Sequence, residues 1–385
     1  MRTIRITLLA AAAVLLAVTP VAHASVQSGS RNCAQPDGRV SSSTIRSGIV
    51  YLGGSFTHVK DRQGVSRPRT GLAAISLDSC ELLPWSADTN GDVYAVKAVG
   101  ASIYVGGDFT RVDGTARARL AAVAADTSQV RAFNPGVNGP VRALAVSEGK
   151  VYAGGSFTQV GGVGRGHLAA FNRDTGQLSR TWKPTTTGSV LTLSSSPERR
   201  RIYVGGSFTA LNGMSAHRYL GAVDPTQGQL RERFRPRVDF PVLSVTAKVG
   251  GVYAGGGGHG GHLAIWNADG SLQRPLYQTD GGVQAVKVHG NSLYAGGHFT
   301  NYCIGNTGSG SPYTCDRPLQ RRKLFEVSLV TGHLTGWAPS LNSPRGVFTE
   351  SVPARTGDLW VGGDFTTVNS TPQAHLAAFR ADARN

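Results

Sequence analysis

Histidine is the residue type whose placement in this sequence first suggests chemistry. His167, His262 and His375 each directly precede the leucine that opens a recurring Leu-Ala-Ala-type segment. Other copies of the segment carry glycine, arginine, tyrosine or lysine at the same place (Gly71, Arg119, Tyr219 and Lys323). A position that accepts such different side chains favours a structural or solvent-facing role over catalysis.

The segment 255–262 is rich in glycine and contains both His259 and His262. Paired histidines suit a transition metal, although a shortened loop is the simpler interpretation. The segment also resembles a phosphate-binding loop, but no helix pattern follows it to supply the N-terminus that would hold a phosphate. No nucleophile elbow, zinc-protease helix or dinucleotide fingerprint occurs in the sequence. We therefore predict no catalytic residue, no metal ligand and no cofactor.

The charge balance gives a clearer signal. Lys and Arg number 39 against 23 Asp and Glu, for a formal net charge of +16. Many basic residues fall in loops that strand alternation places on one face: Lys60, Arg62, Arg67, Arg69, Arg111, Arg117, Arg119, Arg165, Arg218, Arg235, Arg237, Arg317, Arg321, Arg322 and Lys323. We call this the loop face, and we expect its charge to attract an anionic glycan, a cell-wall polymer or an acidic protein.

Two alternatives bear on this charge. The opposite face is also basic at 199–201, so a high arginine content could instead reflect base composition and solubility. Nucleic acid is not expected as a partner, because aromatic residues are not interleaved with the exposed basic ones.

The elements that position these residues follow from internal repeats. The string Val-Tyr-x-Gly-Gly-x-Phe-Thr, or a close variant, occurs with its glycine pairs beginning at 53, 106, 154, 205, 255, 296 and 362. Each copy precedes a loop, the Leu-Ala-Ala segment, a turn, a segment ending on an aromatic residue and an alternating strand that opens with valine. Four strands in each unit of about 40–50 residues indicate a β-propeller. We predict an all-β fold with seven four-stranded antiparallel blades.

The 51 glycines agree with this prediction. They follow no three-residue period, which excludes collagen, and their density disfavours a helical bundle. The hydrophobic content of 40% disfavours a disordered chain.

The two ends of the chain predict how the ring closes. The last unit ends soon after 376–379 and lacks its outer strand, whereas residues about 29–36 precede the first unit. We expect the N-terminal strand to pair with the final blade. Cys303 and Cys315 lie 12 residues apart in one loop and are expected to form a disulfide, which leaves Cys33 and Cys80 as the second pair.

The first 24 residues have the pattern of a secretory signal peptide. Arg2 and Arg5 precede an apolar run over 8–18, and Ala22-His23-Ala24 is a small-x-small cleavage site. The run is shorter than the ~20 residues of a membrane span. We predict a signal peptide over 1–24 and a single secreted, extracellular domain over 25–385 without a membrane span. Cleavage would remove two arginines and lower the net charge from +16 to +14.

The VYVGGxFT, R-x-LAA and TGxLxxW segments resemble the propeller repeats of secreted actinobacterial proteins, akin to the delta-60 repeat and its relatives of unknown function. The resemblance implies a propeller fold and export. Two groups of enzymes share fragments: the segment 171–182 is similar to the tryptophan-docking repeat of quinone dehydrogenases, and the Tyr-x-Gly-Gly strand is similar to kelch repeats of copper oxidases.

These fragments contain packing residues. The adjacent cysteines of quinone sites and the His/Tyr/Cys grouping of copper sites do not occur in the sequence. We therefore expect a non-catalytic extracellular binding or scaffold module. The alternative is a secreted oxidoreductase, or a polysaccharide lyase or hydrolase, with its site at the mouth of the central channel.

Overall fold

The computed structural model describes residues 26–304, 315 and 317–381. The predicted signal peptide over 1–24 lies outside this part of the chain. The described residues form β-strands and one short 3-10 turn, η1 (Ser215–His217). In the described residues, no helix has the length and apolar character that a membrane span requires.

Seven sheets share one plan, in which three consecutive strands of the repeat pair antiparallel. The first strand of each sheet lies innermost: β3 (Arg39–Arg46), β8 (Val93–Val99), β13 (Val141–Ser147), β18 (Val190–Ser195), β21 (Val242–Lys248), β25 (Val283–His289) and β30 (Val347–Ser351). The second carries the glycine pair: β4 (Ile49–Ser55), β9 (Ser102–Gly107), β14 (Lys150–Gly155), β19 (Ile202–Gly206), β22 (Gly251–Gly256), β26 (Ser292–Gly297) and β31 (Leu359–Gly363). The third is the Leu-Ala-Ala segment: β7 (Leu72–Ser76), β12 (Leu120–Ala124), β17 (Leu168–Asn172), β20 (Leu220–Val223), β23 (Gly261–Asn267), β29 (Leu324–Ser328) and β34 (Leu376–Ala381).

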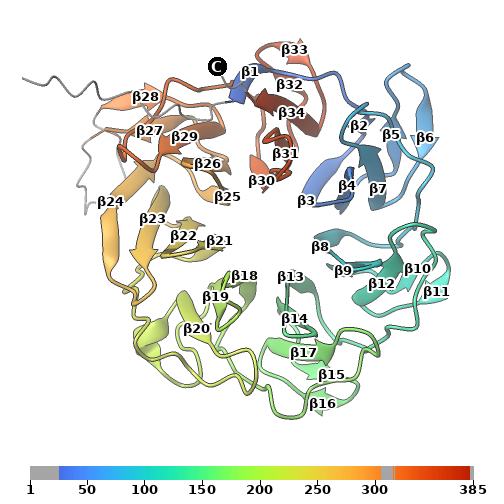
Figure 1. Ribbon diagram of the computed structural model, residues 1–385, viewed down its shortest axis with the longest axis vertical. Coiled ribbons are helices and arrows are strands. Elements are labelled where there is room, and N and C mark those ends of the chain that lie inside the picture. The colour runs from blue at the N-terminus through green and yellow to red at the C-terminus, as the bar shows by residue number, and fades with distance from the viewer. Residues whose placement is uncertain (1–25, 305–314, 316, 382–385) are drawn as a thin grey trace, which may run out of the picture.

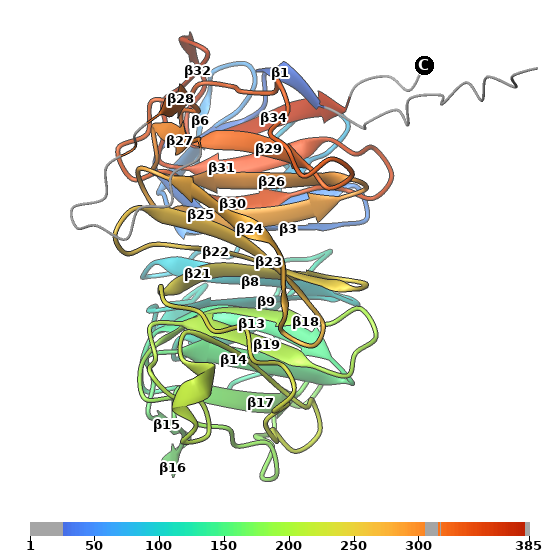
Figure 2. The same cartoon turned by 90° about the vertical axis from the view of Figure 1, so that its left-hand side faces the viewer.

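The sheets are arranged around one axis, with the N-terminal and C-terminal strands side by side (Figure 1). Innermost strands that follow one another in the chain are in contact, and β30 also contacts β3. The strands run roughly along the axis (Figure 2).

The fourth strand is less regular than the sequence predicts. A fourth strand pairs in two of these sheets, as β24 (Leu272–Thr279) and β1 (Val26–Ser30). In the five others its place is taken by an isolated bridge, such as Ile75↔Leu82 or Val123↔Val130. The aromatic residues predicted to end this strand are nevertheless buried, so side-chain packing holds the outer segment where the hydrogen-bond ladder is short.

Small accessory strands follow the second strand of several sheets, and one of them, β2, precedes the first sheet. They pair mostly as hairpins and gather at one end of the molecule, on the left of Figure 2. They are β2 (Gln35–Pro36), β5 (His58–Lys60), β6 (Ser66–Pro68), β10 (Arg111–Val112), β11 (Thr115–Ala116), β15 (Gln159–Val160), β16 (Val163–Gly164), β27 (Asn301–Cys303), β28 (Pro318–Gln320), β32 (Thr367–Val368) and β33 (Thr371–Pro372). This end is the loop face of the sequence analysis.

A close approach between neighbouring sheets explains the repeated glycine. A Cβ added at Gly106 would lie 2.6 Å from Cγ1 of Val141, the valine that opens the next innermost strand. The same kind of approach recurs from sheet to sheet, and Gly362 of the last sheet meets Val40 of the first at 2.6 Å. Only a residue without a side chain lets two strands come this near.

The repeated tyrosine also joins consecutive sheets. The ring of Tyr51 packs edge-on against Trp85 at 5.1 Å, and its hydroxyl donates to the carbonyl oxygen of Ala125 at 2.8 Å. Nε1 of Trp85 donates to the neighbouring carbonyl of Ala124 at 2.9 Å. Ala124 is the last residue of β12 and Ala125 begins the turn that follows, so the aromatic pair of one sheet is anchored on the next. Tyr152 and Trp182 repeat the arrangement.

The repeated threonine fixes the loop before each innermost strand. Thr57 donates from its backbone nitrogen to Oδ1 of Asp37 and from its hydroxyl to Oδ2, both at 2.8 Å. In other units Asn90 binds Thr110 and Asp280 binds Thr300 in a related way. These bonds explain why Phe-Thr follows the glycine pair in six repeats.

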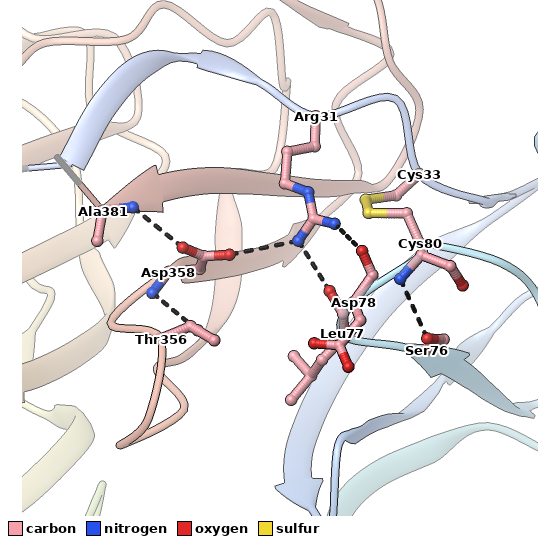
Figure 3. Close-up of polar contacts among 10 residues, drawn as sticks. Arg31, Cys33, Ser76, Leu77, Asp78, Cys80, Thr356, Asp358 and Ala381 are labelled. Carbon is pink, nitrogen blue, oxygen red and sulfur yellow. Dashed lines mark hydrogen bonds and ion pairs between the residues drawn. A yellow bond between two sulfur atoms is a disulfide. The ribbon is translucent and has the colours of Figure 1, made fainter. Parts of the chain in front are cut away.

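The N-terminal segment connects the last sheet to the first. β1 pairs antiparallel with β34, matching Val26 to Ala381. Arg31 then donates from Nη1 to the carbonyl of Leu77 at 2.8 Å and forms an ion pair with Asp358 at 3.3 Å (Figure 3). The disulfide between Cys33 and Cys80 lies beside this network. Both predicted disulfides are present, since Cys303 is bonded to Cys315.

Replacing Gly106 by alanine tests the role of the close approach. The new methyl group would overlap Val141, and such overpacking typically costs about 1–3 kcal/mol in the free energy of unfolding. Chemical denaturation measures this change. The matched control is Gly164→Ala, at a strand glycine with open space around it. Equal stability of the two variants would contradict the packing argument.

Candidate functional site

The loop face gathers the basic residues that the sequence analysis singled out, and many are engaged within the fold. Arg69, Arg117, Arg165 and Arg321 occupy one repeated place, three residues before the third strand. Each donates from Nη2 to a carbonyl 14 residues later: Leu83 at 3.0 Å, Arg131 at 2.7 Å, Ser179 at 2.9 Å and Thr335 at 3.1 Å. These four side chains attach the loop to the outer segment of their own sheet.

The burial of these arginines has an electrostatic cost. Burial lowers the pKa of Arg69, Arg165 and Arg321. In all four side chains Nε is buried without a hydrogen-bond partner among the described residues. Their recurrence in the sequence is therefore explained by backbone support.

Other basic residues of the loop face have contacts nearby. Arg62 pairs with Glu81 at 3.4 Å, and Arg67 pairs with Asp61 at 3.2 Å. Several donate to backbone carbonyls, namely Arg111 to Gly114, Arg119 to Val137, Arg218 to Val238, Arg235 to Glu232 and Lys323 to His298. Lys60, Arg237, Arg317 and Arg322 lie on the same face. The structure brings these residues to one end of the molecule, but it spreads them around the rim.

The histidines before the third strand have a structural role in the turn that leads into the strand. His167 has a φ of 68° and His375 a φ of 61°, a left-handed conformation shared by Arg119, Tyr219 and Lys323. Nδ1 of His167 is hydrogen-bonded to the carbonyl of Thr186 at 2.9 Å, and Nδ1 of His375 to that of Gly363 at 3.2 Å. The residue at this place turns the chain into the strand, which accounts for its varied side chains.

The glycine-rich segment is organised by aromatic stacking. The ring of His262 stacks on Phe240 with centroids 4.5 Å apart, and burial lowers the pKa of His262. Among the described residues, no three His, Cys, Asp or Glu side chains are grouped as metal ligands would be.

The mouth of the central channel, expected from the sequence only as the place of an alternative enzyme site, is lined by residues that the repeats did not single out. Every innermost strand has a register shift directly after its opening valine, as between Val93 and Ala95. Such a bulge leaves one residue out of the ladder and redirects its side chain. The seven bulged residues line one hollow of about 280 Å³ together with Arg39: Ser41, Tyr94, Arg142, Leu191, Leu243, Gln284 and Phe348. We call this set the channel mouth.

The channel mouth combines cations with aromatic rings. The guanidinium of Arg142 lies over the ring of Tyr94 at 4.9 Å, and that of Arg39 over Phe348 at 5.4 Å. Arg39 also pairs with Asp92 at 3.3 Å. Arg142 is exposed, and no carboxylate of the described residues forms an ion pair with it.

Tyr94 is held in place by a hydrogen bond to Asp108. Its hydroxyl donates to Oδ2 of Asp108 at 2.6 Å. Burial, with help from Asp108, raises the pKa of Tyr94 to about 12, so its ring stays neutral and can carry Arg142. Asp108 is the variable residue between the glycine pair and Phe-Thr, which gives that sequence position a role beside the channel.

A repeat alignment contains the signal that finds this site. The opening valine is constant, whereas the residue after it varies among the units and is serine, arginine, leucine, glutamine or an aromatic residue. A residue that varies beside a constant valine is not required for packing between the sheets. Such variation indicates a position that faces solvent.

Farther along the axis the channel contains Glu350. Both carboxyl oxygens are buried without a hydrogen-bond partner among the described residues. Other innermost strands have Val96, Leu144 or Val286 at this place, so the carboxyl enters a packed, apolar contact. Burial raises the pKa of Glu350 to about 8, although the charge of Lys287 opposes the shift.

Comparisons with known proteins agree with this geometry. Residues 147–174, which contain β14–β17, match the family model described as a domain of unknown function (DUF5122) beta-propeller. The crystal structure of the WD40 beta-propeller domain of Doa1 is similar, with a TM-score of 0.62 and 12% identity over 94% of this chain and 98% of that chain. The chain is a β-propeller.

A second structural match is weaker. The computationally designed Ika8 protein has a TM-score of 0.53 and 14% identity, over 91% of this chain and 100% of that one. No curated protein matches the chain in sequence. At these identities the structural likeness shows the propeller fold alone.

Replacing Arg165 by alanine tests whether the repeated arginines support the propeller. Losing the bond to Ser179 is expected to cost about 1–3 kcal/mol, as for other bonds made by charged donors. Arg165→Lys should not restore stability, because an ammonium lacks the planar fork. The control Arg111→Ala removes only an exposed bond to the carbonyl of Gly114, three residues away, and should change the free energy of unfolding by less than about 0.5 kcal/mol. Equal losses from Arg165 and Arg111 would contradict the assignment.

Glu350 should make propeller stability depend on pH. Its pKa is raised from 4.5 to about 8 on folding, so the folded state holds more protons between these values. Stability from this group therefore falls as the pH rises through that window. Glu350→Gln removes this dependence. The melting temperature of the variant, measured relative to that of the native protein, should therefore rise between about pH 5 and about pH 8. A constant difference would show that the carboxyl titrates normally.

Proposed function

We propose that this protein is a secreted seven-bladed β-propeller that binds an anionic polysaccharide at the channel mouth without cleaving it. The blade number is supported by the seven sheets that share one strand plan. Closure of the ring is supported by the approach of Gly362 to Val40 and by the pairing of β1 with β34. In this arrangement the isolated bridges and β24 occupy the places of the outer strands.

Two features of the chain support export, namely the signal-peptide pattern and the disulfides. Residues 1–24 carry the signal-peptide pattern, and the domain would then span 25–385. Two disulfides are consistent with an oxidising compartment, where such bonds form and persist.

The channel mouth carries the proposal of polysaccharide binding. Aromatic rings such as Phe348 and Tyr94 offer flat apolar surfaces for the faces of sugar rings, and guanidinium groups bind carboxylate or sulfate with strong, charge-assisted bonds. Arg142 is suited to this contact because Tyr94 orients it and no described carboxylate neutralises it. Gln284 adds an amide that can bind hydroxyl groups.

The surrounding charge supports an anionic partner. A net charge of +14 after signal-peptide cleavage (+16 less Arg2 and Arg5), with many basic residues on the loop face around the mouth, draws a polyanion toward the site over long range. An uncharged polysaccharide such as a glucan would not be attracted by this positive charge. An acidic protein or a wall polymer such as a polyol phosphate would share the attraction and serves as a competitor in the test.

Titration calorimetry with polygalacturonate tests the proposal, with dextran as the uncharged comparison. We expect polygalacturonate to bind and dextran not to bind. Arg142→Gln should weaken binding about tenfold, the effect of losing one charge-assisted contact of about 1.4 kcal/mol. Phe348→Ala should weaken it further through lost stacking.

The control is Arg200→Gln, an exposed arginine in the hairpin between β18 and β19 at the opposite end. Its affinity should equal that of the native protein. Binding that is unaffected by Arg142→Gln and Phe348→Ala would contradict the site. Shortening of the polysaccharide during the titration would contradict the absence of catalysis and favour the lyase or hydrolase alternative.

A further inference from the structure

The inner half of the channel is a second hollow, farther along the innermost strands than the channel mouth. A cavity of about 460 Å³ is lined by residues from all seven innermost strands. Its polar lining includes Lys97, Lys287 and Glu350 together with hydroxyl groups. None of these residues belongs to the channel mouth, so the argument below is independent of the proposed polysaccharide site.

Two lysines occupy equivalent places in their strands. Lys97 lies four residues after Val93, and Lys287 four residues after Val283. The other innermost strands have small residues there, namely Thr44, Ala145, Ser194, Thr246 and Ser351. β3 and β30 stand between β8 and β25 along the ring of contacts. The two ammonium groups therefore enter the cavity from different sides.

The charge of the lysines is not balanced by the walls. Among the described residues, neither Lys97 nor Lys287 forms an ion pair. Burial lowers the pKa of both lysines, and the charge of Lys287 lowers that of Lys97 further, whereas the charge of Glu350 opposes the shift of Lys287. Glu350 is the one carboxyl group in the lining, and its raised pKa keeps it largely protonated at neutral pH. These three are the titratable residues that line the cavity.

The hydroxyl groups of the walls have hydrogens to donate. Oγ1 of Thr44 accepts from the backbone nitrogen of Ala98 at 3.3 Å, and Oγ of Ser194 accepts from that of Ala247 at 3.2 Å. A hydroxyl that already accepts one bond still has its own hydrogen free for an acceptor. The walls thus offer donors from several strands around the two lysines.

We propose that the inner half of the channel binds a divalent tetrahedral oxyanion, a phosphate or sulfate group, between Lys97 and Lys287. Two negative charges match the two ammonium groups, and four oxygens can accept from donors on opposite sides of the cavity. A cation would be repelled by both lysines. The group could be a free ion or the end of a larger ester that enters along the channel, and the chemistry of recognition is the same.

Titration calorimetry of the purified protein with inorganic phosphate and with sulfate at neutral pH tests the proposal. Both ions should bind, and chloride at equal ionic strength should not. Lys97→Met and Lys287→Met should each weaken binding by about tenfold or more. The control Lys183→Met removes an exposed lysine outside the channel and should bind as the native protein does.

Thermal unfolding provides a readout that does not depend on measurable affinity in each variant. Phosphate should raise the melting temperature of the native protein and leave that of the Lys97→Met, Lys287→Met double variant unchanged. Without phosphate, the double variant should be at least as stable as the native protein, because it no longer places two like charges in one cavity. A double variant that phosphate still stabilises would overturn the proposal.

Glu350 gives a pH signature that a purely structural role would not produce. Above its pKa of about 8 the carboxylate should repel the anion, so phosphate binding should weaken in the native protein and persist in Glu350→Gln. Arg142→Gln should leave phosphate affinity unchanged, which separates this site from the channel mouth. Phosphate binding that depends on Arg142 and not on the lysines would overturn the proposal, as would no binding by either ion.

Discussion

The contact between a side-chain-free glycine and the opening valine of the next sheet sets the geometry of this propeller. Gly106 accepts Val141, and the same relation recurs to Gly362 and Val40. Because it fixes how near the innermost strands lie, hydroxyl groups of one strand reach the backbone of the next. Oγ of Ser42 accepts from the nitrogen of Val96 at 3.1 Å in this way. A larger residue at the glycine would separate the sheets and remove these links together.

The channel follows from the same constraint. Innermost strands that pack this closely leave little room on the axis, and the bulge after each valine turns one side chain toward the mouth. Each unit thereby presents one residue free of packing, while its neighbours in the strand stay buried between sheets. Arg142, Phe348 and Tyr94 differ from one another because the fold does not restrict that place.

Repeats predict the fold well and the site poorly, for a physical reason. The β-propeller and both disulfides were predictable because the repeated glycines, aromatics and valines, and the spacing of the cysteines, report packing that each unit must satisfy. The channel mouth was not, because the direction of a bulged side chain depends on the strand register. The bonds of Arg69 and Arg165 were also hidden, since their acceptors are backbone carbonyls that carry no sequence signal. Lys97 and Glu350 differ from the repeat and could have been noticed, but that they line one hollow is evident only once the innermost strands are placed together.

This contrast distinguishes two kinds of positive charge. An arginine that recurs at the same position of the repeat, such as Arg117, has a structural role in each unit where it occurs. Its guanidinium group donates hydrogen bonds to backbone carbonyl oxygens. Other cations, such as Arg142 and Lys97, lie at positions where the units differ. They are not required for packing, and no carboxylate of the described residues forms an ion pair with them. The net charge alone therefore says little about function, whereas the unbalanced charges on the axis indicate where an anion should be sought.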